Sequence, residues 1–257
     1  MELLIRLHPV REALRARRRE LVRLRVRDPL PKDAAEVLEL AEVAGVPIAR
    51  QTAADLEQGL PDGARSQGFV LEAHALPTLS LEEMLSRGTP GDRTLVCLDG
   101  VEDPQNLGAL ARATDASGAD GLILSNRNAP PLSAAVSRAS AGAIEHLPVA
   151  RVANLGRALE ALKQHDFWVL GADPEAPDCL FETPDRLWEG DLVLVLGAEG
   201  RGIRPGIAQR LDHRVRIPMR GELASLNVAS AGAVLLFERL RRRTRVASPQ
   251  GKEHAGR

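Results

Sequence analysis

Residues 192–205 read LVLVLGAEGRGIRP, and this stretch decides the fold of the chain. Its first five residues are apolar, which is typical of a strand buried on both faces of a parallel sheet. Gly197, Gly200 and Gly202 follow and enclose Glu199, in an order that differs from the dinucleotide-binding fingerprint G-x-G-x-x-G. Ligands bind beyond the carboxyl ends of such strands. Glu199 is therefore either a ligand-binding residue or an exposed residue of a glycine-rich turn.

Apolar strands and amphipathic helices alternate on both sides of this stretch, which predicts an α/β protein. In residues 93–245 the strands are continuous apolar runs, so we expect a mostly parallel sheet covered on both faces. Residues 1–74 alternate in the same way and predict a smaller α/β domain. The Pro- and Gly-containing stretch 75–92 is interpreted as a linker, and the polar stretch 246–257 as a disordered tail.

The apolar periodicity places each element along the chain. We predict strands over residues 21–26, 46–49, 67–73, 94–100, 120–125, 167–173, 191–197 and 214–218. We predict helices over residues 9–20, 32–45, 52–58, 80–85, 106–118, 133–142, 154–165, 207–211 and about 226–243.

Composition limits the classes of function. The chain has 257 residues, of which 44% are hydrophobic, and no run of about 18 apolar residues that would predict a membrane span. The N-terminal stretch lacks the order of a signal peptide, so we expect a cytoplasmic enzyme. Cys97 and Cys179 form neither a disulfide framework nor a metal-ligand motif, and we expect no metal site.

Arginines gather in clusters although the net charge is −1. Nine lie between residues 6 and 27, and a second group closes the last predicted helix. Clustered arginine attracts phosphate, although a solvated face rich in arginine would look the same. The chain has no Tyr and 2% aromatic residues, which disfavours a base-stacking platform. RNA binding would then rely on charge, shape and backbone contacts, and we predict that it uses Arg15, Arg17, Arg18 and Arg19.

A second polar segment, residues 99–112 (DGVEDPQNLGALAR), follows the strand that ends near residue 100. Asn106 is a good helix cap, Gly108 permits close approach of another chain or ligand, and Arg112 lies further along the helix. The simpler interpretation is a capped turn with a surface arginine.

A third segment, residues 217–238 (IPMRGELASLNVASAGAVLLFE), leads from a strand into a long helix with a face of small residues. Backbone N–H groups at the helix start offer hydrogen bonds to a polar ligand, and Ser225 is alternatively an ordinary helix cap. The small residues permit close packing on the sheet or on a second subunit.

Together and in this order, the three segments resemble the signature motifs of the TrmH/SpoU branch of the SPOUT methyltransferases. The matching residues are Asn106, Gly108 and Arg112; Leu196, Gly197, Glu199, Gly200 and Gly202; and Ile217, Pro218, Met219, Ser225, Leu226, Asn227 and Val228. Residues 8–16 and 66–73 are similar to the two ends of the substrate-binding domain of RlmB-type rRNA guanosine methyltransferases.

The resemblance implies a catalytic domain with a C-terminal trefoil knot, S-adenosylmethionine as cofactor, and a homodimer with active sites near the subunit interface. The implied cofactor-binding residues are Gly197, Glu199, Gly200, Ile217, Met219, Leu226 and Asn227. The implied catalytic residues are Asn106, Arg112, Glu199, Ser225 and Asn227. Arg112 is either the proton acceptor, which conflicts with the fact that an ordinary arginine stays protonated at neutral pH, or a group that binds the target phosphate.

The implied function is ribose 2′-O-methylation of RNA, with a guanosine of large-subunit 23S rRNA favoured over tRNA because of the N-terminal domain. Ala224-Ser225 stands where RlmB-type members often carry two serines, which weakens assignment to that subgroup. A non-catalytic RNA-binding relative is the alternative from another class. A nicotinamide-dependent oxidoreductase is disfavoured by the glycine spacing.

Overall fold

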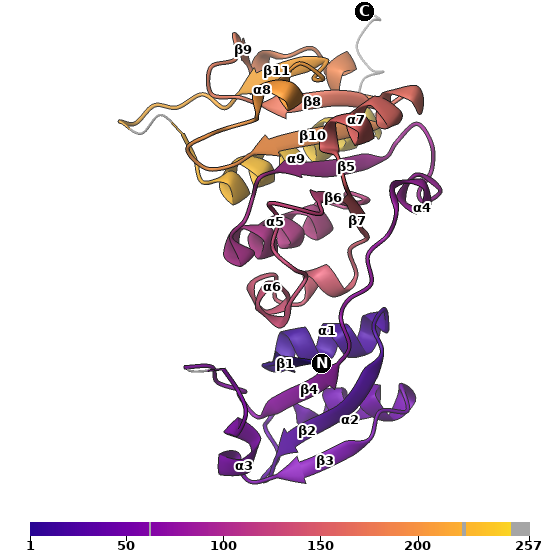
Figure 1. Ribbon diagram of the computed structural model, residues 1–257, viewed down its shortest axis with the longest axis vertical. Coiled ribbons are helices and arrows are strands. Elements are labelled where there is room, and N and C mark those ends of the chain that lie inside the picture. Colours follow the sequence, from indigo (N-terminus) through magenta and orange to yellow (C-terminus); the bar gives the residue numbers. More distant parts are fainter. Residues whose placement is uncertain (62, 223–224, 248–257) are drawn as a thin grey trace, which may run out of the picture.

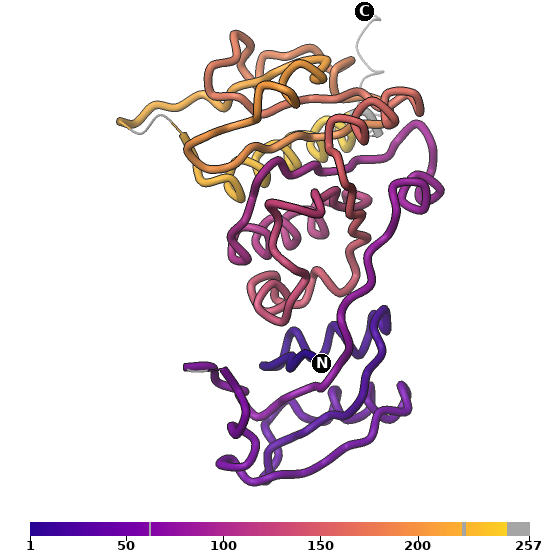
Figure 2. Tube along the Cα trace, in the orientation of Figure 1, coloured from indigo at the N-terminus to yellow at the C-terminus, as the bar shows by residue number. Residues whose placement is uncertain are grey.

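The computed structural model of the protein describes residues 1–61, 63–222 and 225–247. It contains two β-sheets, one in a small N-terminal part and one in a larger C-terminal part, stacked along the long axis of the molecule (Figure 1). The chain crosses between them once, as an extended segment that follows the first sheet (Figure 2). Residues 248–257 of the predicted tail lie outside the described residues.

The small sheet has the strand order β1-β4-β2-β3 and is mixed, because β4 is antiparallel to both of its neighbours whereas β2 and β3 are parallel. Its strands are β1 (Glu2–Ile5), β2 (Leu21–Arg27), β3 (Ile48–Gln51) and β4 (Phe69–Ala73). The helices of this part are α1 (Leu7–Ala16), α2 (Ala34–Val43) and α3 (Ala53–Glu57). Strand β1 was not predicted from the sequence.

The large sheet is parallel throughout, with the order β7-β6-β5-β10-β8-β11-β9. Its strands are β5 (Thr94–Asp99), β6 (Gly121–Ser125), β7 (Val149–Val152), β8 (Trp168–Ala172), β9 (Asp178–Cys179), β10 (Leu192–Gly197) and β11 (His213–Arg216). The parallel α/β architecture expected for this part is confirmed, and β7 and β9 are additions to the predicted strands.

Helices cover both faces of the large sheet. They are α4 (Leu81–Leu85), α5 (Pro104–Ala116), α6 (Ala134–Ala139), α7 (Leu155–Gln164), α8 (Pro205–Ala208) and α9 (Val228–Ala247), with short 3-10 helices η1 (Ala143–Glu145), η2 (Leu180–Glu182) and η3 (Asp185–Trp188). Helix α8 begins and ends earlier than predicted. Helix α9 begins two residues later than predicted, because Asn227 caps it.

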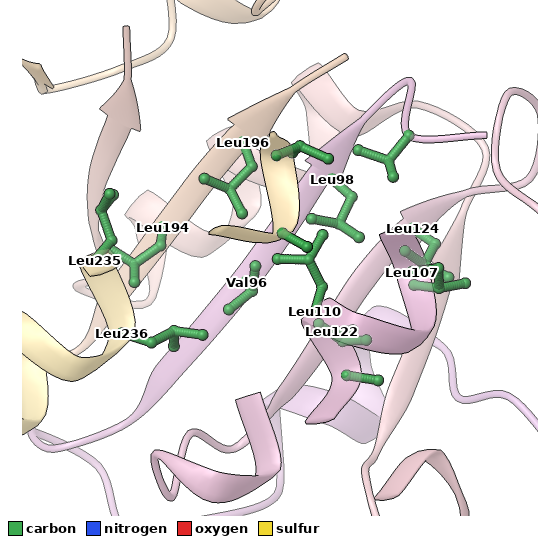
Figure 3. Close-up of a cluster of buried hydrophobic side chains, with 14 of the residues drawn as sticks. Val96, Leu98, Leu107, Leu110, Leu122, Leu124, Leu194, Leu196, Leu235 and Leu236 are labelled. Atoms are coloured by element: carbon green, nitrogen blue, oxygen red, sulfur yellow. The ribbon is translucent and has the colours of Figure 1, made fainter. Parts of the chain in front are cut away.

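Alternate residues of the central strands enter two separate cores, because successive side chains of a strand point to opposite faces. Leu194 and Leu196 of β10 pack in one cluster with residues of α5 and α9, which Figure 3 shows. Val193 and Val195 pack in a second cluster with residues of α7. Each fully buried leucine or valine contributes about 1.5–3 kcal/mol, so the sheet is held from both sides.

Gly232 brings α9 close to the sheet. A Cβ atom at this position would lie 2.3 Å from Leu110 of α5 and 2.7 Å from Leu196 of β10. Of the two uses considered for the small-residue face, Gly232 therefore serves packing within the chain. The helix start, which carries Asn227, is thereby fixed over the carboxyl end of β10.

A buried ion pair joins the two parts of the molecule. The guanidinium of Arg19, fully shielded from solvent, lies 2.9 Å from Glu2 and 2.9 Å from Glu145, which precedes β7. Ser137 donates a further hydrogen bond of 2.8 Å to Glu145. Arg18 donates to the carbonyl oxygen of Leu147 at 2.5 Å.

These contacts correct the expectation that Arg19 binds RNA. Its side chain has no exposed surface with which to reach a phosphate, and its charge is already neutralised by two carboxylates. Arg18 is partly buried and is likewise engaged across the same contact. Arg15 and Arg17 remain exposed.

No helix in the described ranges has the combination of length and apolar character that a bilayer crossing requires.

Replacing Arg19 by Ala should lower the free energy of unfolding by about 3–5 kcal/mol, because it leaves the buried carboxylate of Glu145 without its positively charged partner. Urea denaturation followed by circular dichroism measures the change. The control is Arg50→Ala, an exposed arginine with no side-chain partner among the described residues, which should shift stability by about 0.5 kcal/mol or less. Equal shifts for the two variants would show that the buried pair does not hold the two parts together.

Candidate active site

Three loops meet at the carboxyl edge of the large sheet. Strands β5 and β10 are parallel neighbours, with Asp99 opposite Gly197 at their ends. The loop after β5 leads into α5, which Asp103 and not Asn106 caps, and Asn106 lies in the first turn of that helix. The loop after β10 carries Glu199. The start of α9, which packs on α5 and β10, brings Asn227 to the same place. The three segments singled out from the sequence therefore converge.

The loop after β10 folds back directly onto the strand. Ala198 and Gly202 exchange two backbone hydrogen bonds, of 3.1 and 2.8 Å. A Cβ atom at Gly197 would lie 2.1 Å from the carbonyl carbon of Gly202 and 2.3 Å from the nitrogen of Ile203. No residue other than glycine fits at position 197 without moving the backbone, so this glycine determines the path of the loop.

Arg204 anchors the far end of the loop. Its Nε donates to Oδ1 of Asp99 at 2.7 Å, and its backbone N–H donates to Oδ2 at 2.9 Å. Asp99 is buried, and its hydrogen bond raises the pKa of Arg204 above the usual value. The ends of β5 and β10 are thus tied together below the loop that carries Glu199.

Asn106, Glu199 and Asn227 form one hydrogen-bonded cluster. The amide of Asn106 donates to Oε1 of Glu199 at 3.2 Å. The amide of Asn227 donates to the same oxygen at 2.5 Å and to Oδ1 of Asn106 at 2.8 Å. Oε2 of Glu199 has no partner in the described part of the chain, so it is available to accept a hydrogen bond from a bound hydroxyl group.

Asn227 is oriented by the helix that it caps. Its Oδ1 accepts hydrogen bonds from the backbone N–H groups of Ala229 at 2.8 Å and Ser230 at 3.4 Å. The amide nitrogen must then face away from the helix, toward Glu199. Ser225, considered as the cap from the sequence, is instead exposed in the loop before the helix.

A cavity of about 420 Å³ lies beside this cluster, between the loop after β10, the segment after β11 and the start of α9. All seven residues expected to bind a cofactor line it: Gly197, Glu199, Gly200, Ile217, Met219, Leu226 and Asn227. Leu196, Ile217, Met219 and Leu226 provide apolar walls, and Glu199 with Asn227 provides a polar end. The volume is in the range of small-molecule sites.

A second hollow of about 290 Å³ lies on the other side of Glu199. It is lined by Asn106, Asp103 and Arg201 and shares Ala198, Glu199 and Val228 with the larger cavity. The polar cluster therefore stands between a slot for a small molecule and an open surface. This arrangement can hold a donor on one side and admit an acceptor from the other.

Arg112 does not join the cluster within one chain. It lies six residues after Asn106 on α5, which rotates its side chain by about 240° around the helix axis relative to Asn106. Arg112 is exposed, lines neither of the two hollows and has no side-chain partner among the described residues. Ser225 lines the larger cavity.

The N-terminal arginines lie in the small domain. Arg15 is exposed and pairs with Glu12 and Glu36, and Arg17 is exposed with a bond to the carbonyl of Leu14. Both cysteines are buried and unpaired, and burial raises the pKa of the Cys97 thiol. Within residues 1–61, 63–222 and 225–247, no three His, Cys, Asp or Glu side chains are grouped so as to hold a metal ion.

Several residues of the site were not identified from the sequence. Ala172, the last residue of β8, and Pro174, which follows the strand, line the larger cavity, and Arg201 lines the smaller hollow. Strand β8 ends at the same edge as β10, so the rule that ligands lie beyond strand ends points to Ala172 and Pro174. The glycine-rich pattern indicated Glu199 as a candidate ligand-binding residue, but it gave no reason to single out Arg201 or Arg204.

Known proteins share this arrangement of domains. The model of the SpoU rRNA methylase family matches residues 93–237, and the model of the RNA 2′-O ribose methyltransferase substrate-binding domain matches residues 7–79. The chain is 40% identical over 212 residues to the 23S rRNA (guanosine-2′-O-)-methyltransferase RlmB of Ralstonia nicotianae, with 81% of this chain and 82% of that protein covered. It is 39% identical over 209 residues to RlmB of Pseudomonas aeruginosa, with coverages of 80% and 82%.

The fold is also that of a solved methyltransferase. The crystal structure of the SpoU methyltransferase AviRb from Streptomyces viridochromogenes matches with a TM-score of 0.77 at 25% identity, over 95% of this chain and 90% of that one. A further structure of AviRb contains the cofactor AdoMet. These matches confirm the resemblance drawn from the three motifs, and the chain belongs to the SpoU rRNA methylase family.

Proposed function

We propose that the protein transfers a methyl group from S-adenosylmethionine to the ribose 2′-oxygen of a guanosine in 23S rRNA, in the cytoplasm. The observation that carries the proposal is the convergence of Asn106, Glu199 and Asn227 beside one cavity, which Glu199 and Asn227 line. The choice of 23S rRNA rests on the relatives named RlmB and on the matched substrate-binding domain. The trefoil knot implied by the family remains a prediction.

The larger cavity fits S-adenosylmethionine by size and by chemistry. Its apolar walls, Leu196, Ile217, Met219 and Leu226, suit an adenine ring, and Glu199 and Asn227 suit polar groups of the cofactor. The cradle also depends on Gly197, where a side chain would collide with the loop that forms one wall. S-adenosylmethionine supplies an electrophilic methyl group on a positively charged sulfur.

The residues of this chain then have to orient the ribose, accept a proton and exclude water. Methyl transfer requires the 2′-hydroxyl about 3 Å from the methyl carbon and in line with the bond that breaks. The smaller hollow beside Asn106 gives the ribose access to the cofactor cavity. Glu199 and the two asparagines, which are hydrogen-bonded to one another, would hold the hydroxyl, and Oε2 of Glu199 would receive its proton.

Within one chain Arg112 lies outside the cluster, so it can take part in the reaction only if it comes from a second subunit. We propose that the protein is a homodimer in which Arg112 of one chain reaches the active site of the other and binds the target phosphate. Its exposure and its rotation away from Asn106 on α5 support this arrangement. An isologous two-fold dimer would bring both copies of Arg112 into place at once.

The proposed substrate is tested by mapping ribose methylation along 23S rRNA from a strain that lacks the gene. One 2′-O-methylguanosine should disappear and should return when the gene is restored. An unchanged methylation profile would reject the assignment to rRNA.

Replacing Asn106 by Ala should lower kcat by at least about 100-fold and leave S-adenosylmethionine binding intact, because Asn106 does not line the cofactor cavity. Glu199→Ala should lower kcat to a similar extent and also weaken cofactor binding, because Glu199 does line it. Methyl incorporation and calorimetry measure the two effects. The matched control is Gln105→Ala, the exposed neighbour of Asn106, which should behave as wild type. Wild-type turnover in Asn106→Ala would contradict its role.

Arg112→Ala should be nearly inactive alone, yet regain activity when mixed with inactive Asn106→Ala. In a randomly mixed dimer population, about a quarter of the sites would combine an intact Asn106 from one chain with an intact Arg112 from the other. Methyl incorporation after mixing, unfolding and refolding the two variants measures this recovery. No recovery despite confirmed heterodimers would show that Arg112 acts within its own chain. Full activity of Arg112→Ala alone would show that Arg112 has no role in the reaction.

A further inference from the structure

A third hollow, of about 470 Å³, lies at the same edge of the large sheet, beyond the ends of β6 and β7. Its polar lining residues are Ser125, Arg127, Asn128, Asn154, Arg204 and Arg210. No carboxylate is among its lining residues in the described part of the chain. Strands β6 and β7 follow β5 in the sheet, on the side opposite to β8. The hollow and the cofactor cavity therefore flank the polar cluster from opposite sides.

Arg210 is held across the first turn of α7. Its Nε donates to Glu160 at 2.8 Å, and a Cβ atom at Gly156 would lie 2.8 Å from the same nitrogen. The absence of a side chain at position 156 therefore allows the guanidinium to lie against the helix start. A cation is unfavourable at the positive end of a helix dipole, and the ion pair with Glu160 of α7 offsets this placement. Arg210 lines the hollow, where Glu160 offsets part of its charge.

Arg127 is presented by a braced loop after β6. The guanidinium of Arg151 donates to the carbonyl oxygens of Ser125, at 3.3 Å, and Pro130, which lie on either side of Arg127. Arg127 itself is exposed and has no side-chain partner among the described residues. The backbone around Arg127 is thus fixed, while its guanidinium pairs with no carboxylate among the described residues.

Arg204 connects this hollow to the active site. It ends the same loop that carries Glu199, and its guanidinium is fixed by two contacts to Asp99, of 2.7 and 2.6 Å. More than half of its side chain remains exposed despite this pair. Neighbouring strands are about 5 Å apart, so the ends of β6 and β7 lie about 5–10 Å from that of β5. This is the reach of a short stretch of nucleic-acid backbone.

We infer that this hollow, with Arg127, Arg204 and Arg210, binds backbone phosphates of the RNA next to the methylated nucleotide. The inference rests on the proposed function and extends it, by giving the direction in which the RNA leaves the active site: over the ends of β6 and β7, away from the cofactor cavity. Guanidinium groups bind phosphate oxygens through paired N–H donors, which matches a lining of arginine and asparagine. Such contacts position the RNA and do not select its sequence.

The test uses the full-length protein and an unmodified 23S rRNA transcript. Arg127→Glu should raise the Kd for the transcript about tenfold at moderate salt, because one charge-assisted contact is replaced by repulsion. The slope of log Kd against log salt concentration should fall by about 0.7–0.9, the value for one phosphate contact. The Kd for S-adenosylmethionine should not change, since Arg127 does not line the cofactor cavity.

Arg186→Glu is the matched control. Arg186 is also exposed and without a side-chain partner in the described ranges, but it lies on η3, before β10 and so at the opposite edge of the sheet. It should leave both affinities and the salt slope unchanged. A second variant, Arg210→Gln, retains a hydrogen-bond donor for Glu160 and should raise the RNA Kd about threefold or more.

The experiments distinguish failure of the phosphate site from failure of the proposed enzymatic function. If the wild-type protein binds S-adenosylmethionine and methylates the transcript, but Arg127→Glu and Arg210→Gln bind RNA as Arg186→Glu does, the phosphate site is refuted and the enzymatic function stands. If the wild-type protein methylates no RNA, the proposed function fails and the phosphate site fails with it.

Discussion

The candidate active site depends on the close return of the backbone to Gly197. Gly202 and Ile203 approach this residue so closely that a Cβ atom would lie 2.1 Å from the nearest backbone atom. The turn that results points Glu199 toward the neighbouring strand end and lets Arg204 reach the buried carboxylate of Asp99. A side chain at position 197 would therefore disturb the cluster of Asn106, Glu199 and Asn227, the cavity beside it and the anchor to β5 together.

The rest of the fold keeps this turn in register with its partners. Two apolar cores hold β5 and β10 side by side, so that their ends meet. Gly232 seats α9 on β10 and α5, which sets the position of the helix start, and the cap made by Asn227 turns its amide toward Glu199. Hydrophobic packing thus determines a polar geometry at its edge, and the exposed cluster needs little stability of its own.

The sequence predicted the parallel sheet and three polar segments, of which Asn106, Glu199 and Asn227 lie together while Arg112 lies apart. Continuous apolar runs identify β5 and β10, but their adjacency, which brings Asn106 to Glu199, follows from no local pattern and came from the family resemblance. Strands β1 and β7 were not predicted. Each is the edge strand of its sheet and is held by pairing with β4 or β6, which the local sequence does not show. Arg17 and Arg19 look alike in sequence, yet only Arg19 is buried. Its partner Glu145 lies 126 residues away, so no local pattern predicts the burial of Arg19.

We propose that Asn106, Glu199 and Asn227 act together in the transfer of a methyl group to a ribose oxygen. The most direct measurement is mass spectrometry of nucleosides after purified protein, S-adenosylmethionine and an unmodified 23S rRNA transcript are incubated together. The account predicts a single new nucleoside, 2′-O-methylguanosine, with the added mass on the ribose. A methyl group found on a base, or no methylated nucleoside from folded protein that binds the cofactor, would contradict it.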